Sequence, residues 1–110
     1  MKMTNEHRWV WEIIVPVEMN GKEINVDYHR EWDTKVRKIS GGLTISKVAK
    51  GQWISPSNAL FVERVIPVKI ACTKEQIRQI ADITLEHYKQ EEVMYYKISN
   101  EVHFLKGPKP

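Results

Sequence analysis

The amino-acid sequence predicts an α+β domain whose elements follow the order strand, helix, strand, strand, helix, strand. Apolar residues alternate along residues 9–17 and 60–71, which is the spacing of half-buried strands. They recur every three or four positions along residues 27–39 and 73–90, which is the spacing of amphipathic helices. Turn residues separate these segments. A split βαβ order of this kind packs two helices on one face of an antiparallel sheet.

The first strand is the apolar stretch near the N-terminus. Every second residue of it is apolar and projects from one face: Trp9, Trp11, Ile13, Val15 and Val17. Val10 and Ile14 lie on the other face, so both faces carry apolar side chains and the strand is predicted to be largely buried. Asn20-Gly21 then forms a turn.

The first helix starts at about Asp27. Its apolar stripe consists of Tyr28, Trp32, Val36 and Ile39, at steps of four, four and three residues. Gly41-Gly42 ends the helix, because glycine readily adopts the left-handed conformation found at helix C-termini.

Two strands follow and are expected to pair as a hairpin. The first spans residues 43–45 and resumes at 51–54 after a loop, and the turn cluster 55–58 leads into the second strand at 60–71. Because Pro67 has no N–H, this second strand is predicted to be an edge strand or to be bulged at that residue.

The second helix is predicted to begin with a capping box. In this motif the Thr73 hydroxyl accepts a hydrogen bond from the backbone amide of Gln76, and the Gln76 side chain accepts one from the backbone amide of Thr73. Its expected apolar face consists of Ile77, Ile80, Ala81, Thr84 and Tyr88. The final strand is predicted at residues 93–98, with an extension through Val102 and Phe104 beyond a bend.

Length and composition indicate one domain. The chain has 110 residues, 42% of them apolar, and about 100 to 150 residues is the commonest domain size. We expect a single domain over residues 1–106 and a flexible C-terminal tail over 107–110.

A cytoplasmic location is the expectation, which means the host cytoplasm if the gene belongs to a phage. Cys72 is the only cysteine, so no internal disulfide can form. The apolar run at residues 10–17 is broken by Glu12 and Pro16 and is shorter than the roughly 20 residues that span a bilayer.

The most informative functional feature is an uneven distribution of charge. The net charge is only +3, but no acidic residue occurs between Thr34 and Val62. That stretch carries Lys35, Arg37, Lys38, Lys47 and Lys50. Such a surface attracts phosphate or carboxylate groups, and two adjacent glycines are able to point successive N–H groups at one anion.

Several short motifs resemble a family of small bacterial and phage proteins of unassigned function. They are Gly41-Gly42-Leu43-Thr44, Gly51-Gln52-Trp53, Glu63 and Gln90-Glu91-Glu92-Val93. The family carries a GG(L/A)T, GxW, E and QExV pattern, and this chain differs from it in having Glu92 where a small residue is usual. The resemblance implies a ferredoxin-like fold and supplies no reaction.

The candidate ligand-binding residues are Gly41, Gly42, Thr44, Lys47, Lys50, Trp53, Arg64 and Tyr95. The basic side chains are assigned to phosphate groups, and Trp53 and Tyr95 to stacking on a ring. The alternative is that the glycines only end a helix, that Trp53 covers the sheet, and that the lysines are solvated surface.

No catalytic or metal-binding set is predicted. The four histidines lack a close ligand spacing, and Cys72 is interpreted as a buried thiol although it precedes a helix N-terminus. Glu63 and Glu91 are an acid–base pair only if sheet pairing brings them together.

The preferred function is non-enzymatic binding of a small anionic, nucleotide-like ligand without a cofactor, for instance by a phage anti-defence protein that sequesters a host immune nucleotide signal. An enzyme with an acid/base pocket at a dimer interface and a protein- or RNA-binding module remain open. We also expect a homo-oligomer and no membrane partner. The aromatic side chains predicted to drive self-association through the sheet are Trp9, Trp11, Trp53, Tyr95 and Tyr96.

Overall fold

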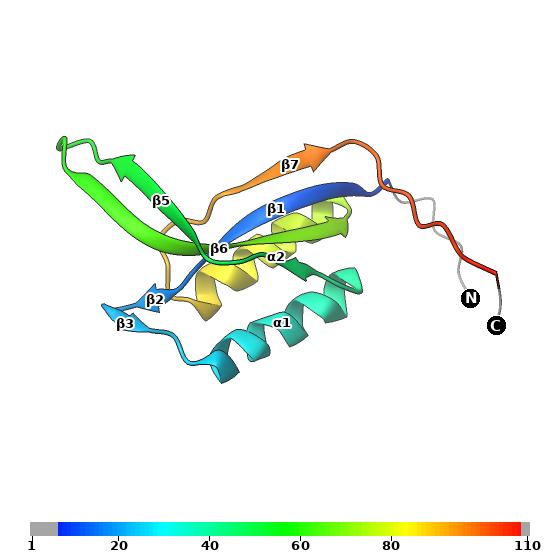
Figure 1. Cartoon of the computed structure of the whole chain (residues 1–110), viewed down its shortest axis with the longest axis horizontal. Helices are drawn as coiled ribbons and strands as arrows, with labels where there is room; N and C mark the ends of the chain where they lie inside the picture. Colours follow the sequence, from blue (N-terminus) through cyan, green and yellow to red (C-terminus); the bar gives the residue numbers. More distant parts are fainter. Residues whose placement is uncertain (1–6, 109–110) are drawn as a thin grey trace.

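A computed structural model describes residues 7–108, and two helices cover one face of an antiparallel sheet (Figure 1). The predicted α+β architecture is confirmed. Residues 1–6 of the predicted domain and 109–110 of the predicted tail lie outside the described residues. The elements are β1 (Trp9–Pro16), β2 (Glu18–Met19), β3 (Lys22–Glu23), α1 (Val26–Ser40), β4 (Thr44–Ile45), β5 (Ala49–Ile54), β6 (Leu60–Cys72), α2 (Lys74–His87) and β7 (Tyr95–Ser99).

The main sheet has the order β4-β6-β1-β7, and β5 pairs with β6 beyond the end of β4. The strand predicted after α1 is therefore split, since β4 pairs with Val68 and Lys69 and β5 pairs with residues 60–65. Asn20-Gly21 forms the predicted turn, and it closes a separate two-stranded hairpin of β2 and β3. The structure places β7 two residues later than predicted and shows no strand at Val102 or Phe104.

The prediction that Pro67 marks an edge strand is wrong, because β6 lies between β1 on one side and β4 and β5 on the other. Pro67 pairs in regular register with Ile14 of β1. Its carbonyl accepts from the amide of Ser46, so its own nitrogen also faces the β4–β5 side. The outer strand is interrupted there between Ile45 and Ala49, so the missing N–H of Pro67 costs no ladder hydrogen bond.

Both helices begin where the sequence predicts and α1 also ends there, whereas α2 ends at His87 and not near Gln90 as predicted. Asn25 caps α1 by accepting from the amide of Asp27 at 2.7 Å. Gly41 ends α1 with a left-handed φ of 90° and donates to the carbonyl of Arg37. Thr73 and Gln76 form the complete capping box of α2.

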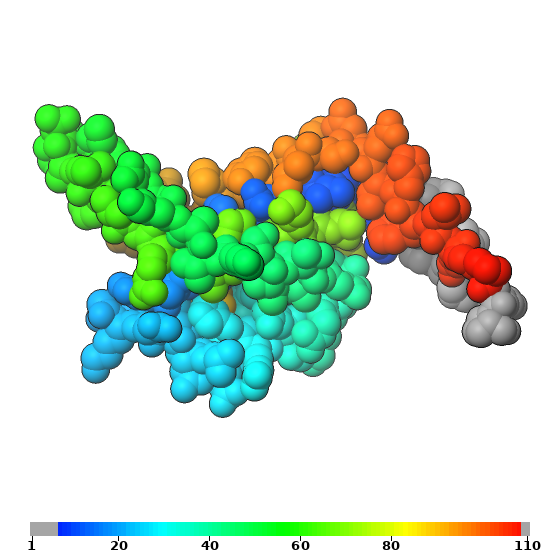
Figure 2. Space-filling model, viewed as in Figure 1, coloured from blue at the N-terminus to red at the C-terminus, as the bar shows by residue number. Residues whose placement is uncertain are grey.

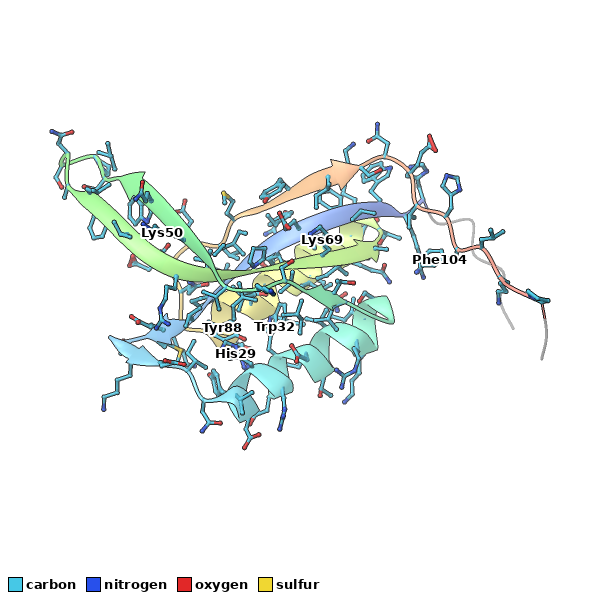
Figure 3. All side chains as sticks on the ribbon, in the orientation of Figure 1. His29, Trp32, Lys50, Lys69, Tyr88 and Phe104 are labelled. Carbon is cyan, nitrogen blue, oxygen red and sulfur yellow. The ribbon has the colours of Figure 1, made fainter. Side chains whose placement is uncertain are left out.

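The core lies between the helices and the face of the sheet that they cover. The predicted apolar faces are confirmed, since Trp32 and Val36 of α1 and Ile77 and Ile80 of α2 are fully buried. Trp32 donates from Nε1 to Oγ1 of Thr84 at 2.9 Å, which links the two helices. Figure 3 shows Trp32 and Tyr88 in the layer between the helices and the sheet.

Residues 49–65 form an arm that stands away from this core (Figure 1). It consists of β5, the outer half of β6 and the turn between them, in which Asn58 has a φ of 68°. The predicted hairpin at residues 55–58 is confirmed. Neither α1 nor α2 packs on the arm, whose side chains are exposed from Gln52 to Arg64 apart from the half-buried Ser55.

Candidate functional site

The best candidate site is a shallow groove at the base of the arm. It has a volume of about 420 Å³ and is called the arm-base groove below. Its lining residues are Glu18, Val48, Ala49, Lys50, Val62, Glu63 and Arg64. Two of the predicted ligand-binding residues, Lys50 and Arg64, are thus brought together here.

Strand register explains why Lys50 and Arg64 meet. They are direct cross-strand partners in the antiparallel pair of β5 and β6, and Gly51 pairs with Glu63 at the next position. Cross-strand partners project from the same face of a sheet. Since the even-numbered residues of β6 point toward the helix side, Lys50 and Arg64 lie on that side, where the arm leaves the body of the protein.

The charges of the groove are mixed. Arg64 is held by Oε2 of Glu18 at 3.0 Å and Oε1 of Glu23 at 3.7 Å, and its hydrogen bond to Glu18 raises the pKa of Arg64. Within residues 7–108 neither Lys50 nor Glu63 forms a side-chain hydrogen bond or an ion pair. The groove therefore offers one unneutralised cation, one unneutralised carboxylate and a fixed guanidinium.

The glycine pair lies elsewhere, at the end of α1. The Gly41 amide donates to Arg37 and the Gly42 amide donates to Oγ of Ser40 at 3.4 Å. Both N–H groups have local partners, so the pair serves as the predicted helix stop. In this conformation the two amides do not form an anion-binding nest.

Register also separates the remaining candidates along β6. Thr44 pairs with Lys69, whereas Trp53 pairs with Phe61. Eight positions of a strand correspond to about 26 Å. Lys47 lies in the exposed connection between β4 and β5 and does not line the arm-base groove. One chain therefore does not bring all eight predicted residues into one site.

The two predicted ring contacts occupy different surfaces. Trp53 stacks on Phe61 with centroids 4.5 Å apart, on the face of the arm opposite to Lys50. Tyr95 is in β7 at the far edge of the sheet, where it pairs with Ile13 and packs near Trp11. Within one copy these two rings cannot clamp the same small ligand.

The groups considered for catalysis have structural surroundings. Cys72 is fully buried, and burial raises the pKa of its thiol to about 11, as expected of an inert buried thiol. Glu63 lies on the arm, whereas Glu91 lies in the connection before β7. Among the described residues no group of three or more His, Cys, Asp or Glu side chains is placed to hold a metal ion. In that same part of the chain no helix is long and apolar enough to cross a membrane.

A second hollow of about 540 Å³ lies at the opposite end of the sheet from the arm. It is formed by His7 and Arg8 together with residues 100–104. Its aromatic member, Phe104, is labelled in Figure 3 at the end remote from Lys50. None of the eight candidate ligand-binding residues lines it.

Sequence reasoning missed the acidic wall of the arm-base groove. The β2–β3 hairpin brings Glu18 and Glu23 to Arg64, although Glu18 and Arg64 are 46 positions apart in the sequence. The signal available was the Asn20-Gly21 turn, which is typical of a two-residue hairpin. No local pattern indicates that this hairpin lies beside the arm.

The comparisons with known proteins establish the fold. No protein-family model matches the sequence, and no curated protein matches it. Among solved structures, CutA1 from the psychrotrophic bacterium Shewanella sp. SIB1 superposes with a TM-score of 0.67 at 12% identity, covering 92% of this chain and 88% of that chain. A phage SAM lyase in complex with S-methyl-5′-thioadenosine superposes with a TM-score of 0.65 at 17% identity, covering 91% of this chain and 87% of that chain.

The divalent cation tolerance protein CutA1 from Thermus thermophilus gives a TM-score of 0.63 at 8% identity, covering 92% of this chain and 87% of that chain. At these identities the likeness is one of fold alone. The chain has the ferredoxin-like fold that the sequence resemblance implied.

Proposed function

We propose that this protein binds a small nucleotide-like molecule in the arm-base groove, where Lys50 holds the anionic group of the ligand. The single observation that carries the proposal is Lys50 itself, a cation without an ion-pair partner among residues 7–108 that lines a groove of about 420 Å³. That volume lies within the range of about 300 to 1,000 Å³ that is usual for small-molecule sites.

The surroundings of Lys50 favour a ligand with several hydrogen-bonding groups. Arg64 is fixed by two carboxylates, so its guanidinium is already oriented and little side-chain entropy is lost when a ligand contacts it. Glu63 supplies an acceptor for hydroxyl or amino groups, and Val48 and Val62 supply apolar contact. A sugar carrying a phosphate or carboxylate on one side matches this set.

Ring contacts come from the edge of the arm. Among the described strands β5 pairs with β6 alone, so its other edge is free. A ligand that extends over this edge from Lys50 approaches Trp53 on the opposite face. A second copy of the chain at the same edge would close the site, in agreement with the expected homo-oligomer.

The ligand panel follows from the fold neighbours and from the charge of the groove. The phage SAM lyase of similar fold holds S-methyl-5′-thioadenosine, an adenine nucleoside. The panel therefore contains S-adenosylmethionine, adenosine monophosphate and cyclic adenosine monophosphate, each of which carries a carboxylate or phosphate group for Lys50. S-methyl-5′-thioadenosine, which has no anionic group, is the neutral comparison. In a thermal-shift assay, a ligand at 100 times its Kd stabilises the folded protein by about 2.7 kcal/mol. A flat response to the whole panel would contradict the proposal.

A second candidate function is an enzyme that acts on such a ligand, and Glu63 is the observation that favours it. This carboxylate lines the groove one position along β6 from Arg64, on the face of the arm opposite to Lys50, and in this reading it accepts a proton from a molecule that extends over the edge of the arm. Incubation with S-adenosylmethionine, followed by chromatography for S-methyl-5′-thioadenosine, tests this reading. Product formation that is lost in Glu63→Gln supports an enzyme, and recovery of intact ligand supports a binder.

The biological role in this proposal is sequestration. A phage-encoded binder of this type lowers the free concentration of a host nucleotide signal in the host cytoplasm without destroying it. The resemblance to small bacterial and phage proteins stays a prediction. Quantitative recovery of bound ligand after denaturation of the complex distinguishes sequestration from turnover.

A further inference from the structure

The single chain exposes more surface than a compact protein of its size. Its accessible surface is 8388 Å², whereas a compact monomer of 13.0 kDa exposes about 6,300 Å². Its radius of gyration is 15.9 Å, against about 13 Å for a compact domain of this length. The arm and the extended segment at residues 100–108 account for the elongated shape in Figure 1.

The arm is apolar on both of its faces. On one face Ile54 and Leu60 are 65% and 63% exposed, and they are cross-strand partners. On the other face Trp53 and Phe61 form an exposed stack. A two-stranded hairpin is marginally stable in water by itself. A surface that covers the arm would therefore stabilise it.

The face of the sheet away from the helices is also uncovered. Figure 2 shows the blue atoms of β1 between β6 and β7, with no helix over them. Its apolar side chains include Val10 and Ile14 of β1 with their β6 partners Ala71 and Pro67. We call this surface the open face.

The polar side chains at the centre of the open face already satisfy one another. Tyr96 donates to Oε1 of Glu12, and Nζ of Lys69 lies 3.4 Å from Oε2 of Glu12. Burying paired charges costs far less than burying lone ones. The open face can therefore be covered by an apolar surface without leaving its carboxylate unpaired.

We propose that the arm of each copy packs on the open face of the next copy, so that identical chains form a closed ring. The arm and the open face are different surfaces of the molecule, which makes the contact heterologous, and heterologous contacts that close produce cyclic oligomers. A face-to-face dimer would leave both arms exposed, whereas an arm-to-face contact covers the open face of one copy and one apolar face of the arm of its neighbour.

The dimensions agree with this contact. The outer half of β6, residues 60–65, is about 20 Å long, and three neighbouring strands of the open face span about 10 to 14 Å. A copy in a ring takes part in two contacts, and standard contacts bury about 800 Å² per partner. That total of about 1,600 Å² lies within the excess of about 2,000 Å² that the single chain exposes. This inference goes beyond ligand binding, because assembly is measured without any ligand.

Complementary variants test the inference. The arm variant carries Ile54→Asp and Phe61→Asp, one change on each face of the arm. The face variant carries Ile14→Asp, with Val10→Asp as the second choice if the first does not fold. Gln79→Asp, on the exposed surface of α2, is the matched control. Far-UV circular dichroism and thermal melting verify that each variant folds, and sedimentation velocity at tens of micromolar gives its mass.

The sedimentation mass of wild type and of Gln79→Asp is expected to exceed the 13.0 kDa mass of one chain. The arm variant alone and the face variant alone are each expected to have the mass of one chain. An equimolar mixture of the arm variant and the face variant is expected to give a species of twice the chain mass, because each supplies the surface that the other lacks. Monomeric wild type, an arm variant that still assembles, or a mixture that stays monomeric would each overturn the inference.

Discussion

Trp32 offers the sharpest test of the packing between the two helices. Its side chain is 1% exposed, its ring lies 6.1 Å from that of Tyr88, and its Nε1 donates to Thr84 at 2.9 Å. Trp32→Ala removes the buried indole and leaves a cavity, which costs about 3 to 5 kcal/mol. The free energy of unfolding of a natural domain is about 5 to 15 kcal/mol, so the variant loses a large part of its stability.

Trp32→Phe separates packing from hydrogen bonding. The phenyl ring keeps most of the buried area, and the Thr84 hydroxyl still donates to the carbonyl of Ile80 at 2.7 Å, so no polar group of Thr84 is left unpaired. We expect a loss of about 1 to 2 kcal/mol, between wild type and Trp32→Ala. Urea unfolding at fixed protein concentration measures the free energy of unfolding of wild type, Trp32→Ala and Trp32→Phe. Lys38→Ala, a change at an exposed position, is the control. Equal losses below about 1 kcal/mol in every variant would refute the packing described here.

Three further predictions concern single residues. Burial lowers the pKa of His29 below its ordinary value of 6.5 although Asp33 opposes the shift, so protonation favours the unfolded chain. Stability should therefore be full above pH 6.5 and fall as the pH drops below it, and a pH series of urea melts should show a weaker fall in His29→Gln. Cys72, whose pKa burial raises to about 11, should react with iodoacetamide at about pH 8 only after unfolding, and rapid labelling of the native protein would contradict its burial. Gly41→Ala should cost about 1 to 2 kcal/mol of stability, because Gly41 has a φ of 90°. Gly42 has no positive φ, and a Cβ added there would meet nothing within 4 Å, so Gly42→Ala should cost much less. Equal melting temperatures of the two variants would contradict this.

The elements whose signals are local were predicted from the sequence. The stripes on α1 and α2, the capping box at Thr73 and the stop at Gly41 each depend on neighbouring residues, and the structure confirms them. Pro67 was misinterpreted because its effect depends on which side of β6 its nitrogen faces. That direction is set by the break between β4 and β5, which no local pattern reveals.

The candidate site was predicted less well, because it depends on pairings between distant segments. The acid-free stretch of sequence suggested one basic patch, but the long strand β6 spreads Thr44 and Trp53 along its length. Alternation along β5 then places Lys50 and Trp53 on opposite faces. Trp11, counted among the aromatic side chains of the association surface, is 8% exposed and donates to the carbonyl of Cys72 in the core.

The arm-base groove as a ligand site is tested most directly by calorimetric titration of two lysine variants. Lys50→Ala and Lys47→Ala each remove one exposed cation from the same acid-free stretch, but only Lys50 lines the groove. With the tightest-binding anionic member of the adenine panel, Lys50→Ala should weaken binding about 10- to 150-fold, the equivalent of a charge-assisted hydrogen bond of about 1.5 to 3 kcal/mol. Lys47→Ala should bind like wild type, and both free proteins should melt like wild type. Equal affinity of Lys50→Ala and wild type would contradict the assignment of the site to this groove.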